Sequence, residues 1–156
     1  MLRRLSIVLF AAPALVVGLS GPTSAAAETT TETAKNVVDT YLDIVPSCDG
    51  GPIYRVTTTT NTVQHVTTTG RGGEHTTFTV TGKVSLVPLD STLGLPSYAG
   101  RLTVRGGFNG NGRVVNATST YNVTLKGSDG SKATYHENRH FNTRPNGTLH
   151  FVFRCH

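Results

Sequence analysis

Residues 75–87, HTTFTVTGKVSLV, decide the fold class of this chain. Apolar side chains recur at alternate positions of this stretch, and Thr, Ser and Lys fill the positions between them. A period of two with one apolar face is typical of a strand in an antiparallel sheet that has one solvated face. The apolar positions are Phe78, Val80, Val84 and Leu86.

The same alternation recurs along the rest of the chain, between short segments rich in Gly, Asn and Asp. We therefore predict an all-β fold with six antiparallel strands in a meander, joined by turns at 70–73, 109–112, 127–131 and 144–147 and by a ten-residue connection at 88–97. The predicted strands are 53–68, 75–87, 98–108, 113–126, 132–141 and 148–154.

The turn chemistry also predicts strand registers. A two-residue hairpin turn within Asn-Gly-Asn-Gly at 109–112 is favoured because Asn and Gly tolerate positive φ. This turn would place Leu102 opposite Ser119 and Val104 opposite Ala117. Strand 53–68 is less regular, because Tyr54 and Val56 occupy even positions whereas Val63 occupies an odd one. A bulge near Asn61 would explain the change of face.

Cys48 and Cys155 bracket the predicted β region. Two cysteines in an exported chain predict a disulfide, which in the chain-entropy model would stabilise the fold by about 4–5 kcal/mol. With six meandering strands, the first strand begins and the last strand ends at the same edge of the sheet. This bond would therefore bring the first and last strands together and close the sheet into a small barrel, similar in shape to lipocalin and dirigent barrels. The alternative is a β-sandwich carrying the same bond.

Residues 1–27 are typical of a bacterial secretory signal peptide. Arg3 and Arg4 precede an apolar run, and Ala25-Ala26-Ala27 is a small-residue cleavage pattern. The run is too short for a comfortable membrane span, so we expect a secreted protein, extracellular or associated with the cell envelope, without stable membrane insertion after cleavage.

The next segment, 28–47, is rich in Thr and precedes a single β domain at 48–156. Residues 28–35 have a composition typical of disorder. In 36–45 the apolar residues follow helical spacing, which predicts either a short helix or an extra strand.

Lys and Arg number 14 and Asp and Glu number 9, and removal of the leader lowers the net charge from +5 to about +3. The bases occur about one per strand or turn, without a run. Because a nucleic-acid-binding protein usually concentrates its bases, we expect no nucleic-acid partner.

One strand breaks the alternation of apolar and polar residues. In 132–141 the positions predicted to face inward include Tyr135, Glu137 and Arg139. The 127–131 turn places Tyr121 opposite Glu137 and Ser119 opposite Arg139. Buried charges must be paired and hydrogen-bonded. The cluster is therefore either a structural Glu–Arg pair or a site that contacts a ligand, and its candidate ligand-binding residues are Tyr121, Tyr135, Glu137 and Arg139.

We expect no metal site and no cofactor. His136 and His140 share the outward parity but lie about 13 Å apart in an extended strand. A loop at 143–147 would place His140 opposite His150, with no carboxylate or thiolate beside them. No nucleophile elbow, phosphate-binding loop or paired-carboxylate motif occurs, so the sequence favours a protein that is not an enzyme and identifies no catalytic residue.

The stretches 98–109 (YAGRLTVRGGFN), 127–131 (GSDGS) and 140–142 (HFN) resemble uncharacterised small exported β-rich proteins of high-GC Gram-positive bacteria. The resemblance covers most of the mature domain and implies export and a β-rich fold. It carries over no activity and no site residues.

Three functions are compatible with these features. The first is a barrel that binds a small, mostly apolar molecule among inward aromatic side chains. The second is a structural or surface-interaction protein of the cell envelope that uses the outward Thr-rich faces. The third is an isomerase- or cyclase-like enzyme that uses Glu137. The inward aromatic positions are Phe78, Tyr98, Phe108, Tyr121, Tyr135, Phe151 and Phe153.

Overall fold

The computed structural model describes residues 26–44, 50–111, 114–143 and 146–155. Most of the predicted leader, together with Cys48, lies outside these ranges. Cys155 ends the last strand and is not a free thiol. The export signal and the Cys48–Cys155 bond stay predictions.

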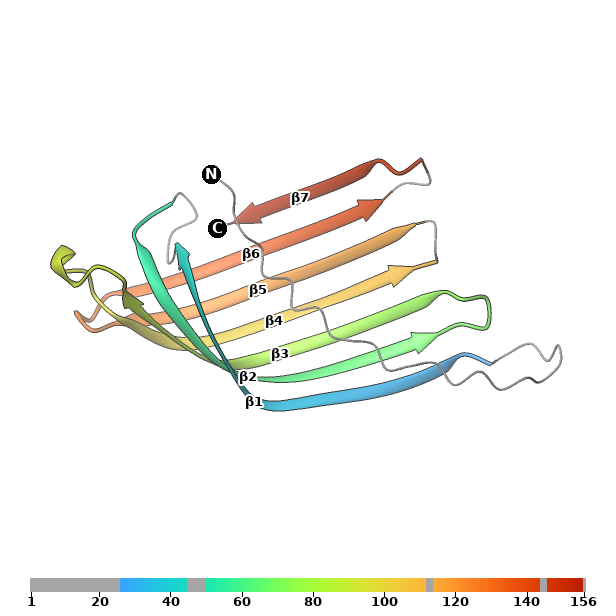
Figure 1. The fold of residues 1–156 in the computed structure, drawn as a ribbon, viewed down its shortest axis with the longest axis horizontal. Helices are drawn as coiled ribbons and strands as arrows, with labels where there is room; N and C mark the ends of the chain where they lie inside the picture. The colour runs from blue at the N-terminus through green and yellow to red at the C-terminus, as the bar shows by residue number, and fades with distance from the viewer. Residues whose placement is uncertain (1–25, 45–49, 112–113, 144–145, 156) are drawn as a thin grey trace.

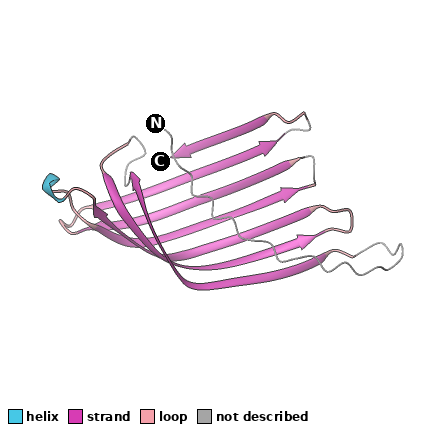
Figure 2. Ribbon diagram, viewed as in Figure 1, coloured by secondary structure: helices cyan, strands magenta, loops and turns pink. Residues whose placement is uncertain are grey.

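Seven strands form one antiparallel sheet in which each strand pairs with the next along the chain (Figures 1 and 2). No helix in the described ranges is long and apolar enough to cross a membrane. The strands are β1 (Glu28–Ile44), β2 (Ile53–Thr68), β3 (Glu74–Pro88), β4 (Tyr98–Gly110), β5 (Val115–Gly127), β6 (Lys132–Thr143) and β7 (Leu149–Cys155), with a 3-10 turn, η1 (Ser91–Leu93), between β3 and β4.

The predicted all-β class and antiparallel meander are confirmed, but the prediction of six strands closed into a barrel is wrong. The sheet is open, and β1 and β7 are its two edges. Because neighbouring strands alternate in direction, the edges of a seven-stranded meander run parallel to each other. A hairpin-type antiparallel ladder therefore cannot join them, and β1 occupies the edge of β2 that the last strand would have to pair with in the predicted barrel.

The additional strand is β1, and it decides between the two structures predicted for residues 36–45. The helix is not formed, because the segment pairs with β2 along almost its whole length. Thr side chains face each other across this ladder, with hydroxyl oxygens 2.8 Å apart at Thr29 and Thr67 and 3.2 Å apart at Thr40 and Thr57. A ten-residue helix has only marginal stability in water, whereas β-branched residues favour the extended ladder.

The bulge predicted in strand 53–68 lies instead in its partner β1. The β1–β2 register shifts between Ala34 and Val37, while β2 pairs with β3 without a shift. Asn36 takes φ of 56°, which Asn tolerates better than most residues, and its N–H donates to Asn61 Oδ1 at 2.9 Å. Val63 therefore faces outward without any break in its own strand.

The hairpin at 109–112 is displaced from its predicted position. β4 continues to Gly110, which pairs with Val115, so Leu102 lies opposite Val123 rather than Ser119, and Val104 opposite Tyr121 rather than Ala117. Asn111 helps to close the longer connection, because Val114 N donates to its Oδ1 at 2.9 Å. The displacement is four residues, an even number, so each side chain keeps its predicted face.

The last part of β1 and the first part of β2 bend out of the plane of the other strands (Figure 1). We call the face inside this bend the inner face and the opposite one the outer face. Tyr54 lies at the centre of the inner core, where its ring meets Tyr98 edge-on at 6.0 Å and its hydroxyl donates to the Pro96 carbonyl at 3.3 Å. The buried core residues are Tyr54, Val56, Val84, Leu86 and Leu125.

Gly82 and Gly100 lie within β3 and β4 and allow neighbouring backbones to approach closely. A Cβ atom at Gly100 would overlap the Thr124 carbonyl oxygen, and one at Gly82 would overlap the carbonyl oxygen of Thr59. Glycine inside a strand often marks such an approach. The close packing of the neighbouring backbones therefore depends on glycine at these two positions.

Gly100→Ala is expected to destabilise the fold by about 1–3 kcal/mol, the range for overpacking, although alanine is normally favoured over glycine inside a strand. Urea unfolding followed by circular dichroism measures the change. Gly107→Ala is the matched control on β4, because its Cβ would lie 3.3 Å from its nearest neighbour, the Thr76 carbonyl oxygen. Equal stability of the two variants would show that the close approach at Gly100 is unimportant.

Alkaline pH is expected to destabilise the fold through Tyr54. Burial raises the pKa of Tyr54 above 10, with smaller contributions from Tyr98 and Asp129. The neutral phenol is therefore favoured in the folded state, and its contribution to stability is present below pH 10 and lost as pH rises through the raised pKa. Urea unfolding at neutral and alkaline pH tests this, since Tyr54→Phe should lose less stability on alkalinisation than the parent chain. An equal loss in both would contradict it.

Candidate functional site

The structure brings together the four residues predicted to form an inner-face cluster. Tyr121 of β5 lies directly opposite Glu137 of β6, and Ser119 lies opposite Arg139, so both predicted registers are confirmed. The tight 127–131 turn fixes this pairing, because Gly127 N donates to the Ser131 carbonyl oxygen at 2.8 Å. Alternation along β6 then places Tyr135 and Arg139 on the face that holds Glu137.

Glu137 is almost completely buried, with 2% of its surface exposed. The Tyr135 hydroxyl donates to Oε2 of the carboxylate, and Arg139 Nε donates to Oε1 and forms an ion pair with it. The Arg139 guanidinium lies 4.9 Å from the centre of the Tyr121 ring. Glu137 is therefore a paired and hydrogen-bonded buried charge, as burial in a low-dielectric environment requires.

This geometry limits the chemistry available to Glu137. Both carboxylate oxygens already accept a hydrogen bond, and a general base must come within hydrogen-bond reach of the proton that it removes. Arg139 is more open, with 29% of its side chain exposed, and its guanidinium also lies 6.0 Å from the Phe153 ring centre. The arrangement is that of an ion pair within β6 whose guanidinium lies near aromatic rings of β5 and β7.

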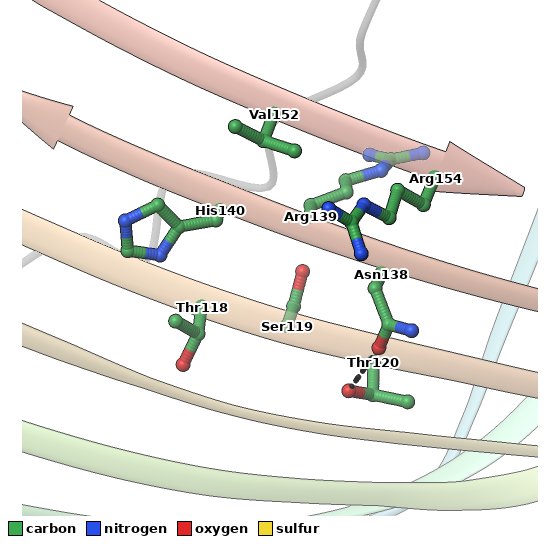
Figure 3. A pocket seen from close by; sticks show the side chains of 8 residues that line it. All are labelled: Thr118, Ser119, Thr120, Asn138, Arg139, His140, Val152 and Arg154. Carbon is green, nitrogen blue, oxygen red and sulfur yellow. Dashed lines mark hydrogen bonds between the residues drawn. The ribbon is translucent and has the colours of Figure 1, made fainter.

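A depression of about 310 Å³ lies over β5, β6 and β7 (Figure 3). Most of its lining residues belong to the outer face, and within it the Thr120 hydroxyl donates to Asn138 Oδ1 at 2.8 Å. It is open to solvent and does not correspond to the barrel interior expected for an apolar ligand, because the sheet that would enclose such an interior is not closed. The lining residues are Thr118, Ser119, Thr120, Asn138, Arg139, His140, Val152 and Arg154.

The outer face concentrates basic side chains that are scattered in the sequence. Register places Lys83 of β3 directly opposite Arg101 of β4, and Lys126 of β5 directly opposite Lys132 of β6. Lys126 pairs with Ala99, two residues from Arg101, so the two pairs are diagonal neighbours. These four exposed residues form a continuous line across four strands, which we call the cationic line.

Further cations extend the positive charge of this face. Arg105 lies four residues from Arg101 on β4, Arg55 lies on β2, and Arg154 on β7, all exposed and with outward parity. The expectation that no nucleic acid is bound assumed scattered bases, and that premise does not hold once the strands are paired.

Carboxylates on the described strands have the opposite distribution, because all of them have inward parity. Four lie on β1, and among the described residues the one ion pair is Glu137–Arg139 on the inner face. The cationic line therefore has no carboxylate beside it on its own face of the strands. The inward acids are Glu28, Glu32, Asp39, Asp43, Glu74 and Glu137.

Like charges directly opposite each other on neighbouring strands are destabilising. The outer face has two such pairs side by side, and no acid on its strands offsets them. Opposite charges or neutral Thr would serve a purely solvated surface better. The outer face is therefore suited to a surface or polymer that supplies negative charge.

The sequence held a signal for this face that counting bases along the chain does not detect. The positions predicted to face outward could have been followed from one strand to the next, which would have assigned Lys83, Arg101 and Lys126 to one side.

His136 and His140 face outward, as predicted, but His140 lies opposite Val152 rather than His150, because β7 pairs two residues farther along than predicted. The described residues contain no group of three or more His, Cys, Asp or Glu side chains placed to hold a metal ion.

Comparison of the chain with protein-family models, curated proteins and solved structures found no match.

The ion pair on β6 is expected to contribute to stability. Glu137→Gln should lower the free energy of unfolding by about 1–3 kcal/mol, because it leaves the partly buried guanidinium without its charged acceptor. Urea unfolding of Glu137→Gln, Arg139→Gln and the double variant measures the coupling. Additive effects of the two substitutions would show that the pair contributes no coupling energy.

Proposed function

We propose that this protein is a surface-interaction protein of the cell envelope that binds an anionic polymer or surface through its outer face. The single observation that carries the proposal is the separation of charge by the sheet, with the cationic line on one side and the strand carboxylates on the other. Expected export places such a protein among the anionic components of the envelope.

The chemistry of the cationic line fits phosphate, sulfate or carboxylate groups that repeat along a partner. Arg101 supplies a planar guanidinium suited to paired oxygen atoms, while Lys83, Lys126 and Lys132 supply compact charges. Thr and Asn side chains on the same face add neutral donors, for example Thr124 and Thr134, which continue the Lys83–Arg101 row. A repeating anion would relieve the repulsion within both like-charge pairs.

Other functions have weaker support. Binding of a small apolar molecule at Tyr121, Tyr135, Glu137 and Arg139 would use a cluster whose carboxylate is already satisfied, on a sheet that encloses no barrel interior. Catalysis by Glu137 would first have to displace Tyr135 or Arg139. The outer face, in contrast, is exposed and needs no rearrangement to meet a large partner.

Arg101→Gln is expected to weaken binding to inorganic polyphosphate about fivefold, and Lys83→Gln combined with Arg101→Gln about 30-fold, since each cation near an anionic surface contributes about 1 kcal/mol. Titration calorimetry at low and high salt measures the effect, and added salt should weaken binding by the parent chain.

Arg71→Gln is the matched control, because Arg71 is an exposed arginine in the β2–β3 turn, away from the cationic line. It should change affinity less than twofold. Arg101→Gln should also leave the fold as stable as before, or more stable by a few tenths of a kcal/mol, because it removes a like-charge contact. Equal losses of affinity in both variants would contradict a specific role for the outer face.

A further inference from the structure

The outer face also exposes a group of large aliphatic side chains beside the cations. On the outer face, Leu42, Arg55 and Val87 are register neighbours across β1, β2 and β3. In the adjacent row of the same face, Ile44 of β1 pairs with Ile53 of β2. Leu89 N donates to the Ile53 carbonyl oxygen at 2.9 Å, which holds the chain after β3 against the same rows. We call this group the aliphatic corner; its members are Leu42, Ile44, Ile53, Val87, Leu89 and Leu93.

Every member of the aliphatic corner is between 42% and 58% exposed. Their elements, the end of β1, the start of β2, the end of β3 and η1, lie at one end of the sheet (Figure 1). Single exposed apolar residues are ordinary on protein surfaces, but a contiguous group marks a surface that meets another apolar phase. The corner contains no aromatic ring; Arg55 lies between Leu42 and Val87, and the exposed Asp90 lies between Leu89 and Leu93 in sequence.

The corner and the cationic line lie on the same face, with Ser85 between them on β3. On β3, Val87 lies four residues from Lys83, and on β2, Arg55 lies within the corner itself. A soluble polyanion would contact the cations but would gain nothing from exposed leucine and isoleucine side chains. A membrane surface supplies both anionic headgroups and an apolar layer below them, and binding there increases with buried apolar area and with attraction to anionic lipid.

We propose that the anionic surface bound by this protein is a phospholipid bilayer, with the aliphatic corner inserted at the headgroup–acyl boundary and the cationic line against the headgroups. This inference rests on the proposed function and specifies its partner. The protein lies on the membrane and does not span it. Docking through the outer face leaves the inner core and the Glu137–Arg139 pair unchanged.

The test uses the chain from Glu28 onward, which contains all seven strands and lacks the apolar leader that would itself bind lipid. Sedimentation with vesicles of phosphatidylglycerol and phosphatidylcholine is compared with titration of inorganic polyphosphate. Leu42→Ser combined with Ile53→Ser should weaken vesicle binding at least about tenfold and leave polyphosphate binding within about twofold, because apolar burial contributes to binding only at a bilayer.

Val63→Ser is the matched control, since Val63 is an exposed outward residue of β2 outside the aliphatic corner. It should leave both binding reactions unchanged. The chain contains no tryptophan, so Leu93→Trp introduces a single reporter. Its fluorescence should shift to shorter wavelength with phosphatidylglycerol-containing vesicles and should not shift with polyphosphate.

The outcomes separate this inference from the proposed function. Any of three results would overturn membrane docking. They are vesicle binding that survives the two serine substitutions, a Leu93→Trp spectrum that does not shift, and equal losses of vesicle binding and polyphosphate binding in the double serine variant. In each of these cases a selective loss of polyphosphate binding in Lys83→Gln/Arg101→Gln would still support an anionic polymer partner. If those two charge substitutions changed neither binding reaction, the proposed function itself would fail.

Discussion

The continuous hydrogen-bonded ladder from β2 to β7 is the constraint on which the rest of this structure depends. The pairing runs through six strands without a register shift, and the shift that does occur lies between β1 and β2. Because side chains alternate between faces, one unbroken register assigns every residue of these strands to the inner or the outer face. The core, the ion pair and the cationic line are all consequences of that assignment.

The two faces use charge in opposite ways. On the inner face, Glu137 is buried, and its two oxygens are satisfied by Tyr135 and Arg139 of the same strand. The Arg139 guanidinium in turn lies near the Tyr121 ring of β5 and the Phe153 ring of β7. On the outer face, the like-charge pairs Lys83–Arg101 and Lys126–Lys132 are left exposed and uncompensated by any acid of the described strands. Like-charge pairs lower stability, so they are expected where selection has acted on binding rather than on folding.

The bend of the sheet lies at its β1 edge. Gly82 and Gly100 let neighbouring backbones approach, the bulge at Asn36 lies where β1 changes register, and the end of β1 and the start of β2 turn over the inner face. The turn buries Tyr54 against Tyr98 and leaves Leu42 and Ile53 on the outside of the bend. One deformation thus supplies the core and exposes the aliphatic corner.

The sequence by itself determined the antiparallel strands from Ile53 to Cys155, the faces of their side chains, and the pairing of Tyr121 with Glu137 across β5 and β6. These features are local, because they follow from alternation and from a tight turn. Only the tertiary structure decided that residues 28–44 form a seventh strand, that the sheet stays open, and that Lys83 lies directly opposite Arg101. Each of these depends on which strands become neighbours, and neither the period of a segment nor the spacing of charges along the chain specifies its neighbours.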